Sequence, residues 1–232
     1  MKYFIGDVHG CIKTLKELVR QISIIDKNPK LYFVGDLIDR GPDSKAVIDY
    51  IIDLNISGVE SMSVRGNHEE MLINAYLHNQ KITDTDWYAN GAERTIKSFN
   101  VNADIKKPVN ELIPKEYFQY CSALPYFIEL PNSIIVHAGL NFRISNPLND
   151  FKTMIWTREE QYDKVLAKGK RIIHGHSPIP LEKLKCKLES GLPDIINVDT
   201  GCVYIQHKGL GYLTAFNADT LELISVKNMD LI

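Results

Sequence analysis

The amino-acid sequence predicts an α/β protein whose sheet contains several parallel strands. Short apolar runs alternate with amphipathic segments through the first third of the chain, and each run ends in glycine and polar residues. This alternation is typical of strands joined by crossover helices, which produce a parallel sheet covered by helices. The 232 residues suffice for a substantial buried core. We therefore expect a single domain over residues 1–232, with one mixed sheet or two packed sheets.

The first three strands are expected from apolar runs, and each run is followed by a helical pattern. The runs cover residues 3–5, 31–34 and 62–64. The helical patterns cover residues 11–24, 44–54 and 69–77, where apolar side chains recur at intervals of three and four. Asp43 or Ser44 is the expected N-cap of the second helix, because both side chains accept hydrogen bonds from free backbone N–H groups.

The remainder of the chain is less regular before the strand pattern resumes. Residues from about 79 to 125 predict a helical excursion near the active site, with an amphipathic piece over residues 116–123. Further strands are expected over residues 126–130, 134–136, 171–173 and 195–198. Residues 211–226 predict an antiparallel hairpin that turns at residues 217–219.

Composition indicates which classes of partner and which cellular compartment are to be expected. The formal charge is -2, from 27 basic and 29 acidic side chains, which argues against a nucleic-acid or membrane-surface binder. The N-terminal residues lead directly into a strand-like run, so we expect no secretory signal and a cytoplasmic protein. The four cysteines are widely scattered, and we expect reduced thiols and no disulfide framework. Cys11 is expected as a small buried residue, with a redox-sensitive thiol as the alternative.

Residues of the types that bind metals follow five of the apolar runs. They are Asp7, His9, Asp36, Asn67, His68, His137, His174 and His176. In open α/β sheets, ligands gather outside the carboxyl ends of the strands, so we expect these side chains to converge at one edge. Their donors are oxygen and imidazole nitrogen without thiolate, a set that suits manganese, iron, zinc or similar ions.

The same positions indicate phosphoryl chemistry. Asp36 is placed in the chain to bridge two ions, and paired ions ~3.5–4 Å apart clamp the attacking and leaving oxygens of a displacement. Arg40 and Arg65 stand beside proposed ligands, and a guanidinium matches phosphate oxygens in pairs. His68 is a candidate to protonate a leaving alkoxide, with Asp39 orienting its ring.

Six strings carry a resemblance to a known family. They are GDVHG (6–10), GDLIDRG (35–41), RGNHE (65–69), HAG (137–139), HGHSP (174–178) and DTG (199–201). In this order and spacing they resemble the phosphoprotein phosphatase family of calcineurin-like metallophosphoesterases. Size and spacing are most similar to the small bacterial and phage serine/threonine protein phosphatases. The likeness extends over nearly the whole chain.

The resemblance implies a four-layer αββα sandwich of two mixed β-sheets flanked by helices. It implies two divalent metal ions, with manganese the first expectation and iron, zinc or nickel as alternatives. The first ion would be held by Asp7, His9 and Asp36, and the second by Asp36, Asn67, His137 and His176. A metal-bridging hydroxide would attack phosphorus directly, with His68 and Asp39 as the general acid. Arg40, Arg65 and Arg158, the last in the string WTRE (156–159), would bind the phosphate.

Either His174 or His176 could be the metal ligand. The alternation of side chains along a strand does not distinguish them, because residues two apart share a face. The family pattern places the ligand after the glycine, so we expect His176 to bind metal and His174 to lie nearby.

The expected activity is that of a serine/threonine protein phosphatase acting on a phosphoprotein or phosphopeptide. The alternative is a symmetrical dinucleoside polyphosphate (diadenosine tetraphosphate) hydrolase. Such relatives typically lack the aspartate of the DRG string and the arginine before GNH, whereas this chain has Asp39 and Arg65. An inactive phosphoprotein-binding relative is disfavoured because every expected site position is filled. A P-loop nucleotidase is excluded because no GxxxxGK[ST] string is present.

Overall fold

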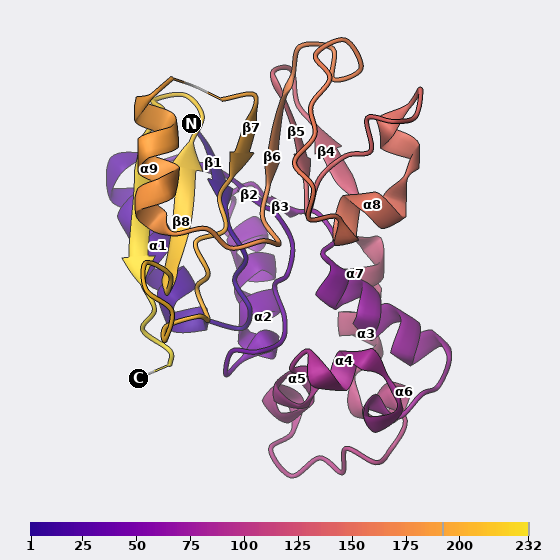
Figure 1. Cartoon of the computed structure of the whole chain (residues 1–232). Coiled ribbons are helices and arrows are strands. Elements are labelled where there is room, and N and C mark those ends of the chain that lie inside the picture. The colour runs from indigo at the N-terminus through magenta and orange to yellow at the C-terminus, as the bar shows by residue number, and fades with distance from the viewer. Residues whose placement is uncertain (192, 232) are drawn as a thin grey trace.

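Two β-sheets pack face to face in the computed structural model, which describes residues 1–191 and 193–231 (Figure 1). The strand order is β3-β2-β1-β8-β9 in one sheet and β4-β5-β6-β7 in the other. The strands are β1 (Lys2–Ile5), β2 (Lys30–Phe33), β3 (Ser61–Ser63), β4 (Phe127–Glu129), β5 (Ser133–Val136), β6 (Arg171–His174), β7 (Ile195–Asn197), β8 (Tyr212–Asn217) and β9 (Leu223–Lys227). The α/β prediction and the prediction of two mixed sheets are confirmed.

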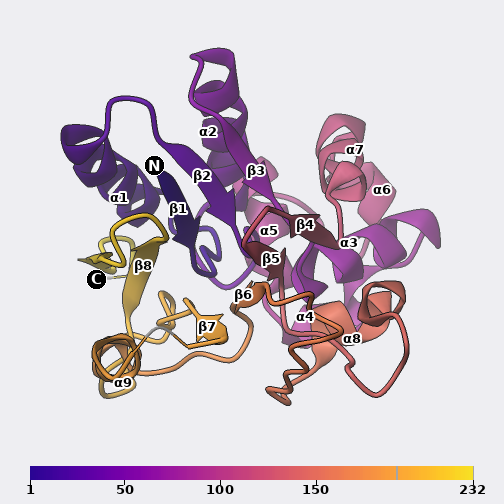
Figure 2. The same ribbon diagram turned by 90° about the horizontal axis from the view of Figure 1, so that it is seen from above.

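Helices occupy both outer faces and one end of the sandwich (Figures 1 and 2). They are α1 (Ile12–Ile25), α2 (Ser44–Ile56), α3 (Asn67–Leu77), α4 (Asp86–Ala89), α5 (Ala92–Phe99), α6 (Val109–Leu112), α7 (Lys115–Ala123), α8 (Phe151–Trp156) and α9 (Leu181–Glu189), with 3-10 turns η1 (Ile82–Asp84) and η2 (Pro147–Asn149). Across the described part of the chain, none of these helices combines the length and apolar character that crossing a bilayer requires.

Both sheets are mixed because a parallel set in each is extended by antiparallel strands. β1, β2 and β3 run parallel, and β8 pairs antiparallel to β1 with Phe216 opposite Phe4. In the second sheet β5, β6 and β7 run parallel, and β4 is antiparallel to β5. The turn of the C-terminal hairpin lies at residues 218–222, later than expected, because Asn217 still pairs with Tyr3 inside β8.

The layers follow from the alternation of side chains along each strand. Ile5 of β1 points toward the helices and packs in a cluster with Leu15 of α1. Its neighbour Phe4 points the other way, into a second cluster between the sheets that includes Ile173 of β6. A third cluster joins the outer face of the second sheet to Met154 of α8. Each sheet therefore buries both faces, which explains the continuous apolar runs in the sequence.

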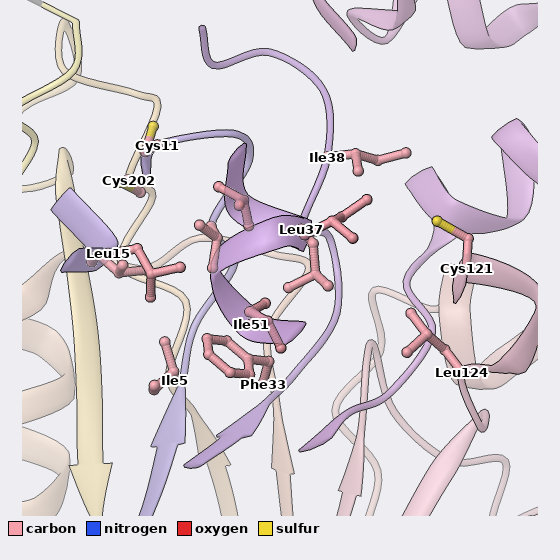
Figure 3. Close-up of a cluster of buried hydrophobic side chains, with 14 of the residues drawn as sticks. Ile5, Cys11, Leu15, Phe33, Leu37, Ile38, Ile51, Cys121, Leu124 and Cys202 are labelled. Atoms are coloured by element: carbon pink, nitrogen blue, oxygen red, sulfur yellow. The ribbon is translucent and has the colours of Figure 1, made fainter. Parts of the chain in front are cut away.

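The loops that carry polar residues are anchored in this core. Leu37 and Ile38 are fully buried and lie among the side chains shown in Figure 3, so they hold the backbone between Asp36 and Asp39. Asp43 caps α2 as expected, and its carboxylate accepts a hydrogen bond of 2.9 Å from the N–H of Ala46.

The segment expected as a helical excursion contains η1 and helices α4 to α7, and it packs largely on α3 (Figure 1). Helices α8 and α9 were not expected from the sequence. Both are short, six and nine residues. Helix α8 is capped by Asp150 but is too short to show an amphipathic stripe, and α9 has no side-chain N-cap. Helix α3 begins at Asn67, two residues earlier than expected, so Asn67 and His68 lie in its first turn.

Candidate metal centre

Two groups of ligand atoms lie at the edge formed by the carboxyl ends of the parallel strands. Within each group all ligand atoms lie within 4.8 Å of one another. One group contains His9, Asp36 and His68, and the other contains Asp36, His137 and His176. Asp36 belongs to both groups, which is the arrangement that a bridging carboxylate requires. The loops after β1, β2, β5 and β6 and the start of α3 contribute these residues.

The second group directs unshared electron pairs at a common point. Nε2 of His137 lies 3.0 Å from Oδ1 of Asn67 and 3.1 Å from Nδ1 of His176. It also lies 3.4 Å from Oδ1 of Asp36. Nδ1 of His137 faces the carbonyl of Val34 at 2.8 Å, so the proton belongs on Nδ1 and the lone pair on Nε2. Burial, followed by the neighbouring His137 ring, lowers the pKa of His176 to about 3, which keeps the His176 imidazole neutral at pH 7.

His9 is oriented in the same way in the first group. Its Nδ1 faces the carbonyl of Ile38 at 2.9 Å, which leaves Nε2 as the ligand atom, 3.6 Å from Oδ2 of Asp36. Burial, the Arg40 guanidinium and the nearby His68 lower the pKa of His9 well below its ordinary value. The ring is therefore neutral at pH 7, and a metal ion would take the Nε2 lone pair that Arg40 contacts in this structure.

Three buried carboxylates gather around the two groups. Asp7 accepts a hydrogen bond of 3.1 Å from the N–H of His176. Burial and the facing Asp199 and Asp36 raise the pKa of Asp7 well above its ordinary value, and burial raises the pKa of Asp199 to about 6. Burial acts to raise the pKa of Asp36 too, but facing histidines, His137 first, hold it well below its ordinary value.

A divalent cation is the group that this set of atoms fits. Buried carboxylates without a cation are costly, and neutral imidazoles with converging lone pairs cannot satisfy one another. Nε2 of His68 and Nε2 of His176 are buried without a hydrogen-bond partner among the described residues. Oxygen and nitrogen donors suit a first-row divalent ion, as the sequence predicted.

The backbone of the site is held in an unusual conformation. Among the residues that the structure describes, eight non-glycine residues have positive φ, and five of them are predicted site residues. These five are His9, Asp36, Asp39, Arg40 and His176, with φ between 47° and 72°. Such conformations persist only when surrounding contacts enforce them, and they cluster at functional sites. A Cβ at Gly66 would collide with the Asp36 carboxylate, so only glycine fits there.

Glu69 fastens two of the ligand loops together. Its buried carboxylate accepts hydrogen bonds from the N–H groups of Asp36, Leu37 and Gly66, at 3.1, 2.8 and 2.8 Å. Burial and the nearby Asp36 raise its pKa above the ordinary value. The loop after β2 and the start of α3 are thereby kept in register around the metal centre.

His68 and Asp39 form the expected pair. Nδ1 of His68 lies 2.5 Å from Oδ2 of Asp39, and both side chains are fully buried. The same oxygen accepts a hydrogen bond of 2.6 Å from the indole N–H of Trp87, and the other oxygen accepts one of 2.5 Å from the hydroxyl of Thr95. Nε2 of His68 faces the centre, 3.8 Å from Oδ2 of Asp36. His68 is therefore placed either to move a proton or to bind metal.

The three predicted phosphate-binding arginines have different surroundings. Nη1 of Arg40 lies 2.8 Å from Nε2 of His9, beside the first group. Nη1 of Arg158 donates to the hydroxyl of Ser177 at 3.2 Å, directly after His176 of the second group.

Arg65 is engaged away from the ligand groups. It pairs with Glu70 at 2.9 Å, donates to the carbonyl of Ser122 at 2.7 Å, and lies over the ring of Tyr126. Its phosphate-binding role stays a prediction, and these contacts are those of a side chain that ties α3 to α7 and β4.

His174 does not belong to either ligand group. Its Nδ1 faces the carbonyl of Gly175 at 3.1 Å, and its Nε2 lies 3.7 Å from Glu160. Four supporting residues were not predicted from the sequence: Glu69, Trp87, Thr95 and Asp199. Asp199 and Glu69 could have been proposed from the sequence, because Asp199 begins the DTG string and Glu69 ends the RGNHE string. Nothing near Trp87 or Thr95 in the sequence indicates their contact with Asp39.

All four cysteines are free thiols, as expected. Cys11 is buried beside Cys202, and Figure 3 shows the two side chains next to each other.

Comparison with known proteins agrees with the predicted fold and family. Residues 3–211 match the family model described as calcineurin-like phosphoesterase. The chain is 31% identical to a bis(5'-nucleosyl)-tetraphosphatase PrpE (asymmetrical) of Geobacillus sp., over 96% of this chain and 92% of the relative. It is 26% identical to serine/threonine-protein phosphatase 1 of Salmonella typhimurium, over 87% of each chain.

Two solved structures share the fold. A putative diadenosine tetraphosphatase has a TM-score of 0.62 at 24% identity, and the match covers 99% of this chain and 94% of the other. A protein serine/threonine phosphatase of Saccharomyces cerevisiae has a TM-score of 0.57 at 16% identity, with coverage of 98% and 79%. With the family match over most of its length, the chain belongs to the calcineurin-like metallophosphoesterases, as its motifs predicted.

Proposed function

We propose that this metallophosphoesterase uses two divalent ions and a histidine proton donor to hydrolyse bis(5'-nucleosyl) tetraphosphates. The observation that supports a dinuclear centre is that Asp36 belongs to both ligand groups. One carboxylate with its two oxygens in two clusters is the feature that distinguishes a paired site from a single one.

The ligand groups above supply His9, Asp36, His137 and His176, and the resemblance to the family adds Asp7 and Asn67. Asp7, His9 and Asp36 would hold the first ion, and the second would be held by Asp36, Asn67, His137 and His176. When bound, two such ions polarise phosphoryl oxygens and lower the pKa of water, which supplies a nucleophile at neutral pH. Manganese is the proposed ion, with iron, zinc and nickel as alternatives, because these donors suit several first-row metals.

The chain itself supplies the proton. Asp39 accepts from Nδ1 of His68, which fixes the ring orientation so that Nε2 faces the centre and can donate to the leaving oxygen. Nε2 has no other partner among the described residues, so the proton is not diverted to protein. Proton donation by a placed side chain typically contributes about 10²–10⁴ in rate.

Two arginines support a substrate with several phosphates. Arg40 lies beside His9 and Arg158 beside His176, so positive side chains stand on both sides of the ligand groups. A polyphosphate chain places charge on both sides of the phosphorus under attack, and guanidinium groups bind such oxygens in pairs. The Geobacillus relative, which covers nearly the whole chain, carries a tetraphosphatase name and supports the same substrate class.

A phosphoserine or phosphothreonine protein is the second candidate, as the sequence analysis expected. The observation that favours it is the His68–Asp39 pair. A serine or threonine alkoxide is a poor leaving group that needs a proton, whereas a nucleotide phosphate departs more readily without one. The Salmonella relative with a protein phosphatase name supports this candidate.

The decisive experiment compares the two substrates on one protein preparation. Chelated protein is refilled with manganese and given diadenosine tetraphosphate or a phosphothreonine peptide, with Asp36→Asn as the background control. We expect the dinucleotide to have the higher kcat/KM and to yield ATP and AMP, the products of asymmetrical cleavage. If two ADP molecules formed instead, the cleavage would be symmetrical.

Faster turnover of the peptide would overturn the dinucleotide proposal and support the protein phosphatase. Loss of both activities without added metal, and their return with manganese, would support the metal assignment under either substrate. The cytoplasmic location stays a prediction.

A further inference from the structure

A cavity of about 160 Å³ opens between the two sheets at the edge opposite the metal centre. It is lined by the starts of β1, β5 and β6, by the end of β8, and by the turns that connect β4 to β5 and β8 to β9. The N-terminus in Figure 1 marks this edge of the first sheet. None of the predicted site residues lines it.

The inner wall of the cavity is apolar. Phe4 and Phe216 contribute rings whose centroids are 6.3 Å apart, and Ile173 faces them from the second sheet. These side chains are at most 2% exposed. A cavity of roughly 150 Å³ with such walls accommodates a benzene-sized group, so an aromatic ring or a branched alkyl chain fits here.

The mouth of the cavity has one positive charge in excess. Lys2, Asp219 and Arg171 are the charged residues of the lining. Lys2 and Asp219 neutralise each other, with Nζ and Oδ1 3.0 Å apart, and Asp219 also accepts from the N–H of Lys2. Arg171 has no ion pair and no side-chain hydrogen bond among the residues described, and its Nε is buried without a partner.

Two other cations near this edge of the molecule are paired with carboxylates. Lys170, which precedes Arg171 in the chain, binds Glu129 at 2.7 Å. The α-amino group of Met1, close to the same edge, binds Asp26 at 2.6 Å. Among the described residues, Arg171 is thus the charged residue of the lining that lacks a partner in the protein, and an anionic ligand in the cavity would supply one.

We propose that this cavity binds a small carboxylate with an apolar body, such as an aryl- or alkyl-carboxylic acid of about ten heavy atoms. The apolar body packs against Phe4 and Phe216, and the carboxylate pairs with Arg171, whose planar fork matches two oxygens. One excess positive charge suits a monoanion better than a phosphate dianion. The site is separate from the phosphoester chemistry and does not depend on the proposed substrate.

The test uses 3-phenylpropionate as the probe on the full-length, metal-loaded protein, followed by calorimetry. The uncharged 3-phenylpropionamide has the same body and serves as the matched ligand. Inorganic phosphate at a constant saturating level occupies the metal centre, which would otherwise attract carboxylates. We expect saturable one-site binding of the acid with a Kd on the order of 1 mM or tighter.

Two variants separate the charge from the volume. Arg171→Gln should weaken binding of the acid tenfold or more, the factor associated with a charge-assisted hydrogen bond. Ala218→Leu, which adds bulk to the lining and leaves Arg171 in place, should weaken both ligands. Arg20→Gln on the exposed surface of α1 is the matched control and should bind as the wild type does.

Each contrary result would overturn the proposal. Absence of saturable binding up to about ten times the expected Kd would remove the site. Equal affinity for the acid and the amide would remove the role of charge. Unchanged binding by a folded Arg171→Gln protein would assign the carboxylate to another place on the molecule.

Discussion

The metal-ligand loops and the helical segment from η1 to α7 serve the same site in different ways. The loops provide every predicted ligand, and each ligand stands one to four residues from the end of a strand or in the first turn of α3. The helical segment provides no member of either ligand group, yet Trp87 and Thr95 hold the carboxylate of Asp39. The difference teaches that short local strings specify the candidate metal ligands, whereas the orientation of the proposed proton donor depends on distant packing.

The largest expected effect comes from changing a predicted metal ligand in the loops. Asp36→Asn should abolish metal-dependent turnover, because an amide cannot bridge two cations as a carboxylate does. The fold should survive, since the amide oxygen can still accept the 3.2 Å hydrogen bond from the N–H of His68. Metal content by mass spectrometry and turnover with manganese are the measurements, with exposed Asp53→Asn as the control. Near-normal turnover by a folded variant would sink the bridging role.

The next largest effect tests whether His68 donates a proton or binds metal. His68→Asn should slow turnover by about 10²–10⁴, the loss expected when a proton donor is removed, with little change in metal content. Exposed His78→Asn is the control and should be neutral. If metal is lost together with activity, His68 binds metal, as its place in the group with His9 and Asp36 permits.

Glu69→Gln should loosen the ligand loops. The amide offers one acceptor oxygen where the carboxylate serves three backbone N–H groups, so at least one buried donor is left unpaired. We expect a free energy of unfolding lower by about 2–3 kcal/mol, seen as a Tm lower by roughly 4–12 °C. Exposed Glu116→Gln should leave Tm unchanged. A stability equal to that of the wild type would show that the three hydrogen bonds are dispensable.

A smaller effect sharpens the role of the helical segment. Trp87→Phe keeps an aromatic ring in the core but removes the N–H that binds Asp39, so proton donation by His68 should weaken about tenfold. The loss should appear with an alkyl phosphate, which needs a proton on its leaving group. It should be much smaller with p-nitrophenyl phosphate, whose leaving group needs none. Equal losses on both substrates would show that Trp87 contributes only core packing. Exposed Trp156→Phe is the control.

The smallest effect concerns a pair outside both regions. The nearby His174 ring, followed by the charge of Lys187, lowers the pKa of Glu160 from 4.5 to about 2. A folded-state pKa below the unfolded value means that stability is present above pH 4.5 and is lost as the pH falls toward 2. Because Glu160 is 46% exposed, solvent screening keeps the contribution small. The Tm gap between wild type and Glu160→Gln should therefore shrink on acidification, and a widening gap would contradict this assignment.

Much of the fold and most of the site could be predicted from the sequence because they depend on local patterns. The strands β1, β2 and β3 were recognisable as apolar runs, and their following glycines and ligands are adjacent in the chain. The strings around Asp36 and Asn67 carry both the chemistry and the turn that presents it. The short helices α8 and α9 lack such a strong local signal, and they are stabilised mainly by packing on the sheets.

What only the tertiary structure decided is where each side chain points and which distant groups it meets. Arg65 is adjacent to the ligand loop in sequence, yet its guanidinium turns to Glu70 and Tyr126. Trp87 and Thr95 reach Asp39 across 48 and 56 residues of chain, a separation that no local pattern encodes. Residue type and strand period determine the available chemistry, but only the packing of helix on sheet brings a donor within hydrogen-bond distance of a particular acceptor.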